Sequence, residues 1–254
     1  MKSALTIAGS DPTGGAGFQA DLKVFRAFGV HGLSIPAALT AQNTSGIGRI
    51  FPVERDFFRA QMDELLGDMR PDALKTGMLY SVWAVEAVAG MIREHSLANL
   101  VVDPVAVSSS GTGLVDDGTL DMIRDTLFPL ARVITPNIYE ASVFTGLNIE
   151  DETDMKEAAL RLKEMGPEVV VVTGGHLERV TLDLYYDGNV FHDLEASKLP
   201  GEYHGTGCAF SAAITACLAS GHTPLESARK AKEFVTEAIR KAYHLGRGMG
   251  LLYL

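Results

Sequence analysis

Short apolar runs alternate with amphipathic stretches along most of this chain, and no other feature constrains its fold as much. Each run is too short for a helix and ends in a Gly, Pro or Asn, which indicates a buried strand that stops at a loop. We expect strands at ALTIAG (4–9), DALKTGML (72–79), NLVVDPV (99–105), ARVITPN (131–137) and EVVVVTGG (168–175). The amphipathic stretches predict helices near 18–29, 54–67, 81–95, 117–127, 138–145 and 152–165. The alternation predicts an α/β fold with a mostly parallel central sheet flanked by helices.

Two segments depart from this rhythm. Residues 30–53 form a long β-like stretch that we expect to make a small flap. Residues 182–196 predict a β-hairpin that turns at Asp187-Gly188. Helical patterns at 207–220 and 224–244 close the chain. Because there is no linker or internal repeat, we expect a single domain over residues 1–254.

The composition excludes several classes of function. The chain has 254 residues, 46% hydrophobic and 21% charged, which is typical of a globular domain with a full core. Its formal net charge of -10 and the lack of a basic run argue against nucleic acid as a partner. The apolar N-terminal run is too short for a signal peptide, and no stretch reaches the ~18 apolar residues of a membrane span. We therefore expect a cytoplasmic protein without a membrane partner.

The stretch YHGTGCAFSAAITACLASG (203–221) contains both cysteines and the most specific motif. The turn Gly205-Thr206-Gly207 precedes Cys208, where a helix of small apolar residues begins. Such a turn aims several N–H groups at one point, which suits an anion, and the field of a helix N-terminus lowers the pKa of a thiol. Cys208 is then a proton acceptor beside a phosphate, or alternatively a small residue packed under the helix cap. Cys217 lies on roughly the opposite helix face, so we expect no disulfide between the two.

Polar and glycine-rich loops follow the predicted strands, at 10–17, 77–78, 103–104, 135–137 and 174–176. Ligands bind at the carboxyl ends of strands in such sheets, so these loops locate a cleft. The loop GSDPTGGAG lacks the GxxxxGK[ST] pattern of a P-loop, and its context is not that of a dinucleotide fingerprint. It can also be a strand–helix turn whose glycines allow tight packing.

Seven motifs stand in the order found in hydroxymethylpyrimidine and phosphomethylpyrimidine kinases, and the chain resembles that family from residue 4 to about residue 248. They are ALTIAGSDPTGGAGFQADLKVF, TAQNTSG, KTGML, VVDPV, TPNIYEA, GGHL and GTGC. The resemblance implies a ribokinase-like fold and an enzyme of thiamine biosynthesis that uses ATP and Mg²⁺. Such an enzyme phosphorylates the hydroxymethyl group of 4-amino-5-hydroxymethyl-2-methylpyrimidine, and commonly phosphorylates the resulting monophosphate again.

The resemblance also implies roles for the residues of the glycine turn. Cys208 would accept the hydroxyl proton, at a position where sugar kinases of the superfamily carry an aspartate. Gly205, Thr206 and Gly207 would present N–H groups to the transferring phosphoryl group as an anion hole.

Four further positions match residues that bind the pyrimidine in that family. Gln42 would read the amino group and a ring nitrogen, since a carboxamide offers both a donor and an acceptor. Gly9, Met78 and Val105 would wall the ring. The alternatives are a solvated flap residue for Gln42 and ordinary core for Met78.

The phosphate and metal positions follow the same resemblance. Asn137 and Glu140 match an N-x-x-E element that orders Mg²⁺ and its waters around the phosphates, with Asn137 on the ATP side and Glu140 on the metal side. Asn137 could equally cap the next helix, with Glu140 in its first turn. Asp103 could face the same cation or cap a turn. Thr173 stands where the family has a lysine that contacts the ATP phosphates.

This chain lacks two lysines of the family pattern. TGGH replaces KGGH at Thr173, and AVSSSG (106–111) replaces a segment with a lysine near Ser109. The lost charge matters more for the second phosphorylation than the first, because the second acceptor is already anionic. Lys75, Lys23 and Lys198 are the candidates for compensation.

Two alternatives remain open at this point. One is a pyridoxal or pyridoxine kinase of the same superfamily, and the other is a pyrimidine-binding paralogue with reduced turnover. The resemblance also implies a homodimer, with residues 30–53 as a contact surface.

Overall fold

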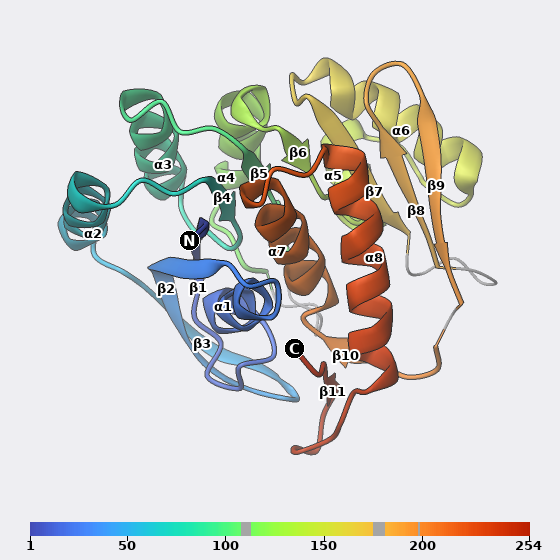
Figure 1. Ribbon diagram of the computed structural model, residues 1–254, viewed down its shortest axis with the longest axis horizontal. Helices are drawn as coiled ribbons and strands as arrows, with labels where there is room; N and C mark the ends of the chain where they lie inside the picture. The colour runs from blue at the N-terminus through green and yellow to red at the C-terminus, as the bar shows by residue number, and fades with distance from the viewer. Residues whose placement is uncertain (108–112, 175–180, 198) are drawn as a thin grey trace.

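A nine-stranded sheet forms the centre of the protein in our computed structural model, which describes residues 1–107, 113–174, 181–197 and 199–254. The strand order is β3-β2-β1-β4-β5-β6-β7-β8-β9 (Figure 1). The strands are β1 (Ser3–Gly9), β2 (His31–Asn43), β3 (Gly46–Pro52), β4 (Ala73–Thr76), β5 (Leu100–Val102), β6 (Val133–Ile134), β7 (Val169–Gly174), β8 (Thr181–Tyr186) and β9 (Phe191–Ala196). The pairs from β2 to β7 are parallel, whereas β3, β8 and β9 join antiparallel at the two edges. The predicted fold class is confirmed.

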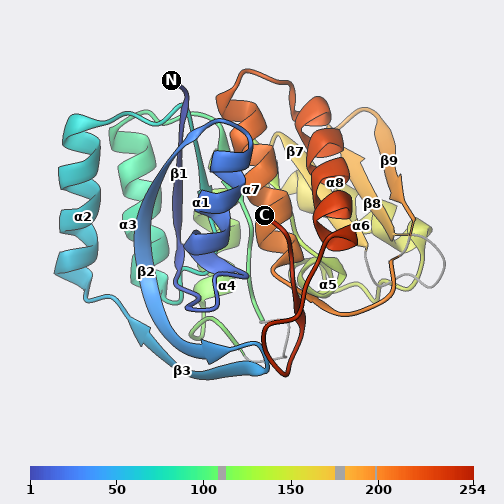
Figure 2. The same cartoon turned by 60° about the horizontal axis from the view of Figure 1, so that its bottom comes forward.

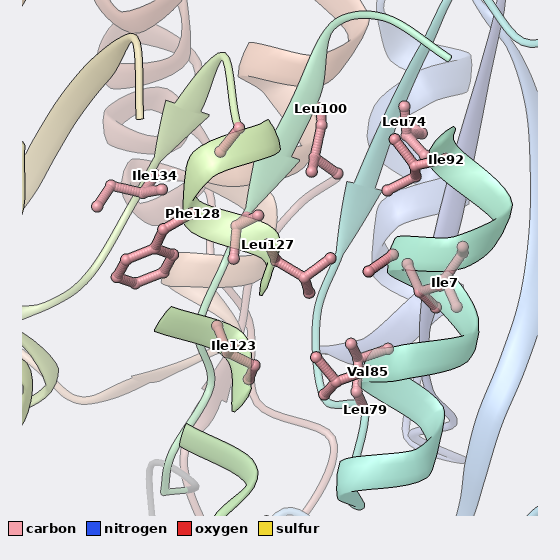
Figure 3. Packing of buried hydrophobic residues seen from close by; sticks show 14 of the residues in the cluster. Ile7, Leu74, Leu79, Val85, Ile92, Leu100, Ile123, Leu127, Phe128 and Ile134 are labelled. Atoms are coloured by element: carbon pink, nitrogen blue, oxygen red, sulfur yellow. The ribbon is translucent and has the colours of Figure 1, made fainter. Parts of the chain in front are cut away.

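Helices cover both faces of this sheet (Figures 1 and 2). On one face lie α1 (Gly17–Ala27), α7 (Thr206–Ala219) and α8 (Pro224–Arg240). On the other lie α2 (Arg55–Asp68), α3 (Val82–Glu94), α4 (Thr119–Met122), α5 (Ile138–Thr145) and α6 (Glu152–Glu164), with a π turn η1 (Ile123–Leu127) and a 3₁₀ turn η2 (Phe128–Leu130). Figure 3 shows the larger core, in which Ile7, Leu74 and Leu100 of the strands meet side chains of α3 and η1.

The Val run of β7 shows why these strands read as continuous apolar sequence. Val169 and Val171 pack toward α7 and α8, whereas Val170 and Val172 pack toward α5 and α6. Successive side chains of a strand point to opposite faces, so a strand covered by helices on both sides must be apolar at every position.

The segment 30–53 forms the predicted flap but begins inside the sheet. From His31 to Ala38, β2 pairs in parallel with β1, and from Ala38 onward it pairs antiparallel with β3. The far end of this hairpin lies beside the C-terminal segment (Figure 2), where Met249 N–H donates to Thr44 O at 3.0 Å. The C-terminal segment also forms a short parallel sheet, β10 (Tyr203–His204) with β11 (Gly250–Leu251), that the sequence pattern did not predict.

Two other predictions are confirmed with changes. Strands β8 and β9 form the predicted hairpin, and Asp187 Oδ1 accepts from the N–H groups of Asn189 and Val190 within the connecting turn. The helix expected at 117–127 is divided into α4 and η1 and continues as η2, whose first turn holds Pro129. Within the described ranges, no helix is long and apolar enough to cross a bilayer.

Candidate active site

The N-terminus of α7 lies at the centre of the site, at the carboxyl-terminal edge of the sheet. Gly205 is the N-cap in the left-handed region, at φ 81° and ψ 16°. A Cβ there would overlap the carbonyl oxygen of Gly15, so the turn requires glycine. No described side chain caps this helix, and Gly207 is exposed. The first N–H groups of α7 therefore have no side-chain cap among the described residues, and the anion-binding role expected of them stays a prediction.

A buried ionic cluster lies beneath this turn. Lys75 of β4 is fully buried, and its Nζ lies 2.8 Å from Asp21 Oδ1 of α1. Thr6 Oγ1 of β1 donates to Asp21 Oδ2 at 2.6 Å. On the other side, Lys75 Nζ lies 3.8 Å from Asp103 Oδ2, which also accepts from Ser211 Oγ of α7 at 2.8 Å. One ammonium thus faces two buried carboxylates.

The prediction that Cys208 has a lowered pKa is wrong. Burial raises the pKa of this thiol to about 12, and the carboxylates of Asp103 and Asp21 add to the rise, while Lys75 opposes it. The helix field is too weak to overcome desolvation and two nearby negative charges. Cys208 therefore rests as a neutral thiol. Cys208 and Cys217 are both free thiols, as expected.

Glu140 and Asn137 form the capping box of α5. Asn137 Oδ1 accepts from Glu140 N–H at 2.9 Å, and Glu140 Oε2 accepts from Asn137 N–H at 3.0 Å. Glu140 Oε1 also accepts from Ala106 N–H at 3.2 Å, which ties α5 to the loop after β5. Burial, reinforced by the charge of Asp103, raises the pKa of Glu140 to about 8. The helix-cap alternative is thus confirmed, and the buried carboxyl is at the same time an unusual acid beside Asp103.

A small apolar cluster lies at the same edge of the sheet as the Cys208 turn. Met78 follows β4, and its sulfur would contact a Cβ at Gly9 within 2.9 Å, so these two positions adjoin. Met78 packs with Ala38 and Leu114, and Val105 packs against the same cluster. The three residues expected to wall a ring therefore lie together at the carboxyl ends of β1, β4 and β5.

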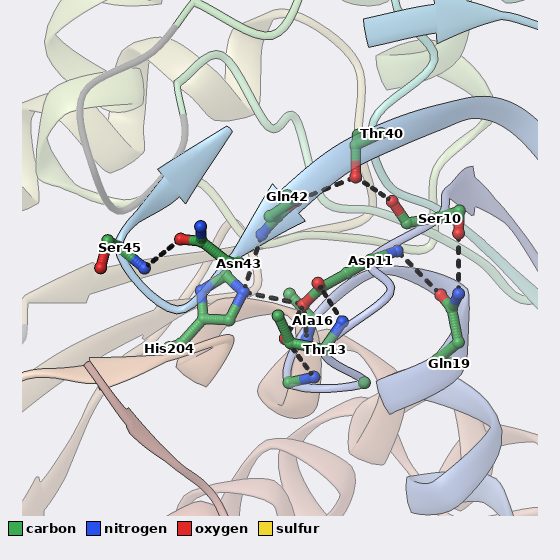
Figure 4. Close-up of polar contacts among 12 residues, drawn as sticks. Ser10, Asp11, Thr13, Ala16, Gln19, Thr40, Gln42, Asn43, Ser45 and His204 are labelled. Carbon is green, nitrogen blue, oxygen red and sulfur yellow. Dashed lines mark hydrogen bonds and ion pairs between the residues drawn. The ribbon is translucent and has the colours of Figure 1, made fainter. Parts of the chain in front are cut away.

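Gln42 reaches this region from the flap and contacts His204 (Figure 4). His204 Nε2 lies 2.8 Å from Asp11 Oδ2 and 3.0 Å from Gln42 Nε2. One ring nitrogen cannot donate to the carboxylate and accept from the amide at once. The conflict disappears if the amide of Gln42 is turned, so that its oxygen accepts from His204 and its NH₂ donates to Thr40 Oγ1. Thr40 Oγ1 can accept this hydrogen bond because its own proton is donated to Ser10 O at 2.8 Å. One N–H and one lone pair of the half-buried amide then remain for a ligand.

Asp11 holds the glycine loop in place. Its carboxylate accepts from Thr13 N–H, Thr13 Oγ1 and Ala16 N–H at 2.8 to 2.9 Å, besides the contact with His204. Burial opposes the charge, but the hydrogen bonds from His204 and Thr13 outweigh it and lower the pKa of Asp11. The loop lies against the α7 turn, where the backbone of Gly15 closely approaches Gly205.

The positions considered for the phosphate site fall in different places. Thr173 is half-buried in β7, and its N–H donates to Pro136 O beside Asn137. Lys75 is the buried ammonium under Cys208, whereas the exposed Lys23 donates to Gly14 O at 2.6 Å. Ser109 and Lys198 lie outside the described residues.

Two parts of the site were missed from the sequence. The Lys75–Asp21 pair had a signal, since a lysine inside the apolar run ALKT (73–76) is out of place unless it is paired. The Asp11–His204 contact had none, because its partners are far apart in the chain and no short motif joins them.

Comparisons with known proteins identify the family of this chain. Residues 11–253 match the family described as phosphomethylpyrimidine kinase. A hydroxymethylpyrimidine/phosphomethylpyrimidine kinase of Streptomyces coelicolor is 42% identical over 97% of this chain and 91% of its own length. A thiamine biosynthesis bifunctional protein of Geobacter sulfurreducens is 45% identical over 98% of this chain, which spans about half (51%) of that relative.

Solved structures give the same fold. A Bacillus subtilis pyridoxal kinase in complex with ADP has a TM-score of 0.91 at 40% identity and covers 99% of this chain and 96% of its own. A phosphomethylpyrimidine kinase of Clostridium difficile has a TM-score of 0.84 at 37% identity, covering 94% and 100%. With a family match over nearly its whole length, the chain is a small-molecule kinase with the ribokinase-like fold and belongs to the phosphomethylpyrimidine kinase family.

Proposed function

We propose that this protein transfers the γ-phosphoryl group of ATP to the hydroxymethyl group of 4-amino-5-hydroxymethyl-2-methylpyrimidine in thiamine biosynthesis, and more slowly to the resulting monophosphate. The observation that carries the proposal is the uncapped N-terminus of α7 with Cys208 in its first turn, at the edge of the sheet where the wall of Gly9, Met78 and Val105 stands. Close relatives named for this reaction support it.

The residues of the chain act by positioning, charge stabilisation and proton removal, as is general for phosphoryl transfer. The N–H groups at Gly205, Thr206 and Gly207 face the transferring group and stabilise its developing charge. Gln42 orients the pyrimidine through its remaining donor and acceptor, and Cys208 accepts the hydroxyl proton. Because the resting thiol is neutral, the rate is expected to rise with pH.

A divalent cation fits the carboxyl groups of the site. Glu140 and Asp103 are buried, and the negative charge of Asp103 raises the pKa of Glu140, which is the situation that a cation relieves. Among the described residues no cluster of three or more candidate ligands occurs, so the protein would hold Mg²⁺ through water and phosphate oxygens, as that ion prefers. When bound, Mg²⁺ neutralises charge on the ATP phosphates.

A phosphate-transfer assay tests the proposal. Purified protein with ATP and magnesium is offered the free pyrimidine alcohol, its monophosphate and pyridoxal in separate reactions. We expect turnover in the order alcohol, monophosphate, pyridoxal. Pyridoxal is the second candidate because pyridoxal kinases share this fold at TM-scores of 0.91 to 0.92, and a preference for it would reverse the assignment. Binding of the pyrimidine without any turnover would instead identify a binding paralogue.

We also propose that the chain is one domain and a homodimer. The helices described above all cover the one sheet, which supports a single domain over residues 1–254. Leu39 and Phe51 are cross-strand neighbours on β2 and the edge strand β3, and both are exposed. Apolar side chains on a free edge favour contact with a second copy, and the molar mass in solution tests this.

A further inference from the structure

Lys75 is the buried charge that the proposed mechanism leaves unused. Its side chain is fully buried in β4, and its ammonium forms a 2.8 Å ion pair with the fully buried Asp21. Burial of such a pair costs desolvation, and replacing it with apolar side chains of similar volume is often neutral or stabilising. Stability alone therefore does not explain why an ion pair lies here.

The surroundings of Lys75 direct it toward the α7 turn. Asp21 holds it from the side of α1 and is itself held by Thr6 Oγ1 at 2.6 Å. On the opposite side, Lys75 Nζ lies 3.5 Å from the carbonyl oxygen of Cys208 and 3.8 Å from Asp103 Oδ2. The ammonium is clamped directly beneath the residue to which we assign proton transfer.

We propose that Lys75 is a positioning residue that acts through Cys208: its ammonium, held by Asp21, stabilises the thiolate that accepts the proton of the substrate hydroxyl. The inference rests on the proposed function, because it takes Cys208 as the proton acceptor. In the step, the O–H bond of the alcohol breaks and an S–H bond forms. The alcohol oxygen bonds to the γ-phosphorus as the bond from that phosphorus to ADP breaks. The step leaves Cys208 as its resting thiol. The proton that this thiol lost to solvent when it became the thiolate is the one that phosphorylation of an alcohol by ATP releases.

The groups that face the thiol come from several elements. Asp21 of α1 and Asp103 after β5 disfavour the thiolate, as does burial, whereas Lys75 of β4 and the N–H of Gly17 favour it. An opposite charge within about 4–6 Å shifts a pKa by roughly 1–3 units. Removal of Lys75 should therefore reduce the thiolate population of Cys208 between about tenfold and a thousandfold.

Alkylation measures this population without any assay of activity. We would treat the folded protein with iodoacetamide between pH 7 and 9.5 and follow Cys208 and Cys217 separately by mass spectrometry, since only the thiolate reacts. Lys75→Met should slow alkylation of Cys208 at least tenfold at each pH, and Asp21→Asn should accelerate it. Cys217, buried near the other end of α7, should not change in either variant.

A merely structural role predicts a different pattern. Loosened packing would accelerate alkylation of both cysteines in both variants, so opposite effects at Cys208 alone are diagnostic. If Lys75→Met does not fold because Asp21 is left unpaired, Asp21→Asn is compared with Asp21→Asn/Lys75→Met, which isolates the lysine in a background without the buried carboxylate. Alkylation of Cys208 that is unchanged or faster on loss of Lys75 overturns the proposal.

The kinase assay separates this inference from the proposed function. If Lys75 acts as we propose, kcat of Lys75→Met falls at least tenfold while the KM values for the alcohol and ATP change little. The rise of kcat with pH is also displaced to higher pH in the variant than in the wild type. A slowed alkylation in a chain that phosphorylates no alcohol would remove the proposed function but support the charge effect of Lys75. Full activity of Lys75→Met would show that its charge is not needed in the step and would overturn its role there.

Discussion

Glu140 makes the stability of this protein depend on pH in a way that a single substitution isolates. Its pKa is about 8 in the folded protein, against an ordinary value of 4.5. Between these values the unfolded chain loses the proton that the native state keeps, so unfolding becomes easier as pH rises. At about 1.4 kcal/mol per pKa unit, the difference corresponds to about 5 kcal/mol of unfolding free energy, present below pH 4.5 and lost above pH 8.

Glu140→Gln removes the titration and retains most of the capping box, because Gln also serves at this position. The amide has one acceptor oxygen for the two N–H groups of Asn137 and Ala106 that the carboxyl binds, which costs about 1–3 kcal/mol at every pH. The pH-dependent part is separate. From pH 5.5 to 8, the unfolding free energy of the wild type should fall by about 3 kcal/mol relative to the variant.

Urea unfolding followed by fluorescence or circular dichroism at each pH measures both parts. Glu226 is a matched control, because it occupies the same capping-box position in α8 but is exposed, and hydrogen bonds from Thr223 lower its pKa. The unfolding free energies of Glu226→Gln and wild type should therefore change in parallel from pH 5.5 to 8, because both proteins keep Glu140. Curves for wild type and Glu140→Gln that run parallel from pH 5.5 to 8 would refute the reasoning, because Glu140 would then titrate normally.

The remaining predictions concern turnover and binding. Cys208→Ser should lower kcat about a hundredfold or more and change pyrimidine binding by no more than a few-fold. In the wild type, kcat/KM should rise from pH 6.5 to 8.5. A plateau near pH 7 would contradict a thiol with a pKa of about 12. Gln42→Ala should weaken pyrimidine binding about tenfold to a hundredfold, because two hydrogen bonds are lost. Calorimetry measures this binding. Equal weakening of ATP binding would contradict the role of Gln42 in orienting the pyrimidine. Thr173→Lys should raise kcat/KM for the monophosphate at least about fivefold, because it adds a positive charge. Thr173→Ser is the neutral control. No gain over that control would show that the missing lysine does not limit phosphorylation of the monophosphate.

The strand and helix pattern was readable from the sequence because its causes are local. Four consecutive buried valines in β7 and the terminating glycines and prolines follow from burial on both faces and from backbone geometry. The division of α4 and η1 and the β10–β11 pair were not readable. The π turn η1 has no local sequence signal, and the β10–β11 pair depends on contacts between residues about fifty positions apart.

The site was readable only where a short motif carries it. GTGC located the α7 turn to which we assign anion binding, and the requirement for glycine at Gly205 is confirmed by its close approach to Gly15. The pKa of Cys208 was predicted in the wrong direction, because a helix N-terminus is visible in a sequence whereas desolvation and the carboxylates of Asp21 and Asp103 are not. Asp21 on α1 and Asp103 after β5 come near the thiol only because the fold packs α1 and β5 against α7.

The raised pKa values of Cys208 and Glu140 have one physical origin. Asp21, Asp103 and Glu140 are buried acids, and Lys75 is the ammonium placed among them, so each acidic group in the cluster makes the ionisation of the next more costly. The protein accepts that cost in stability at the edge of the sheet where phosphates and a cation would bind, as strained functional sites commonly do. A neutral thiol is also a poor nucleophile, so the same acids slow alkylation and oxidation of Cys208. The reactivity of Cys208 is therefore set as much by β4, α1 and the loop after β5 as by the helix that carries it.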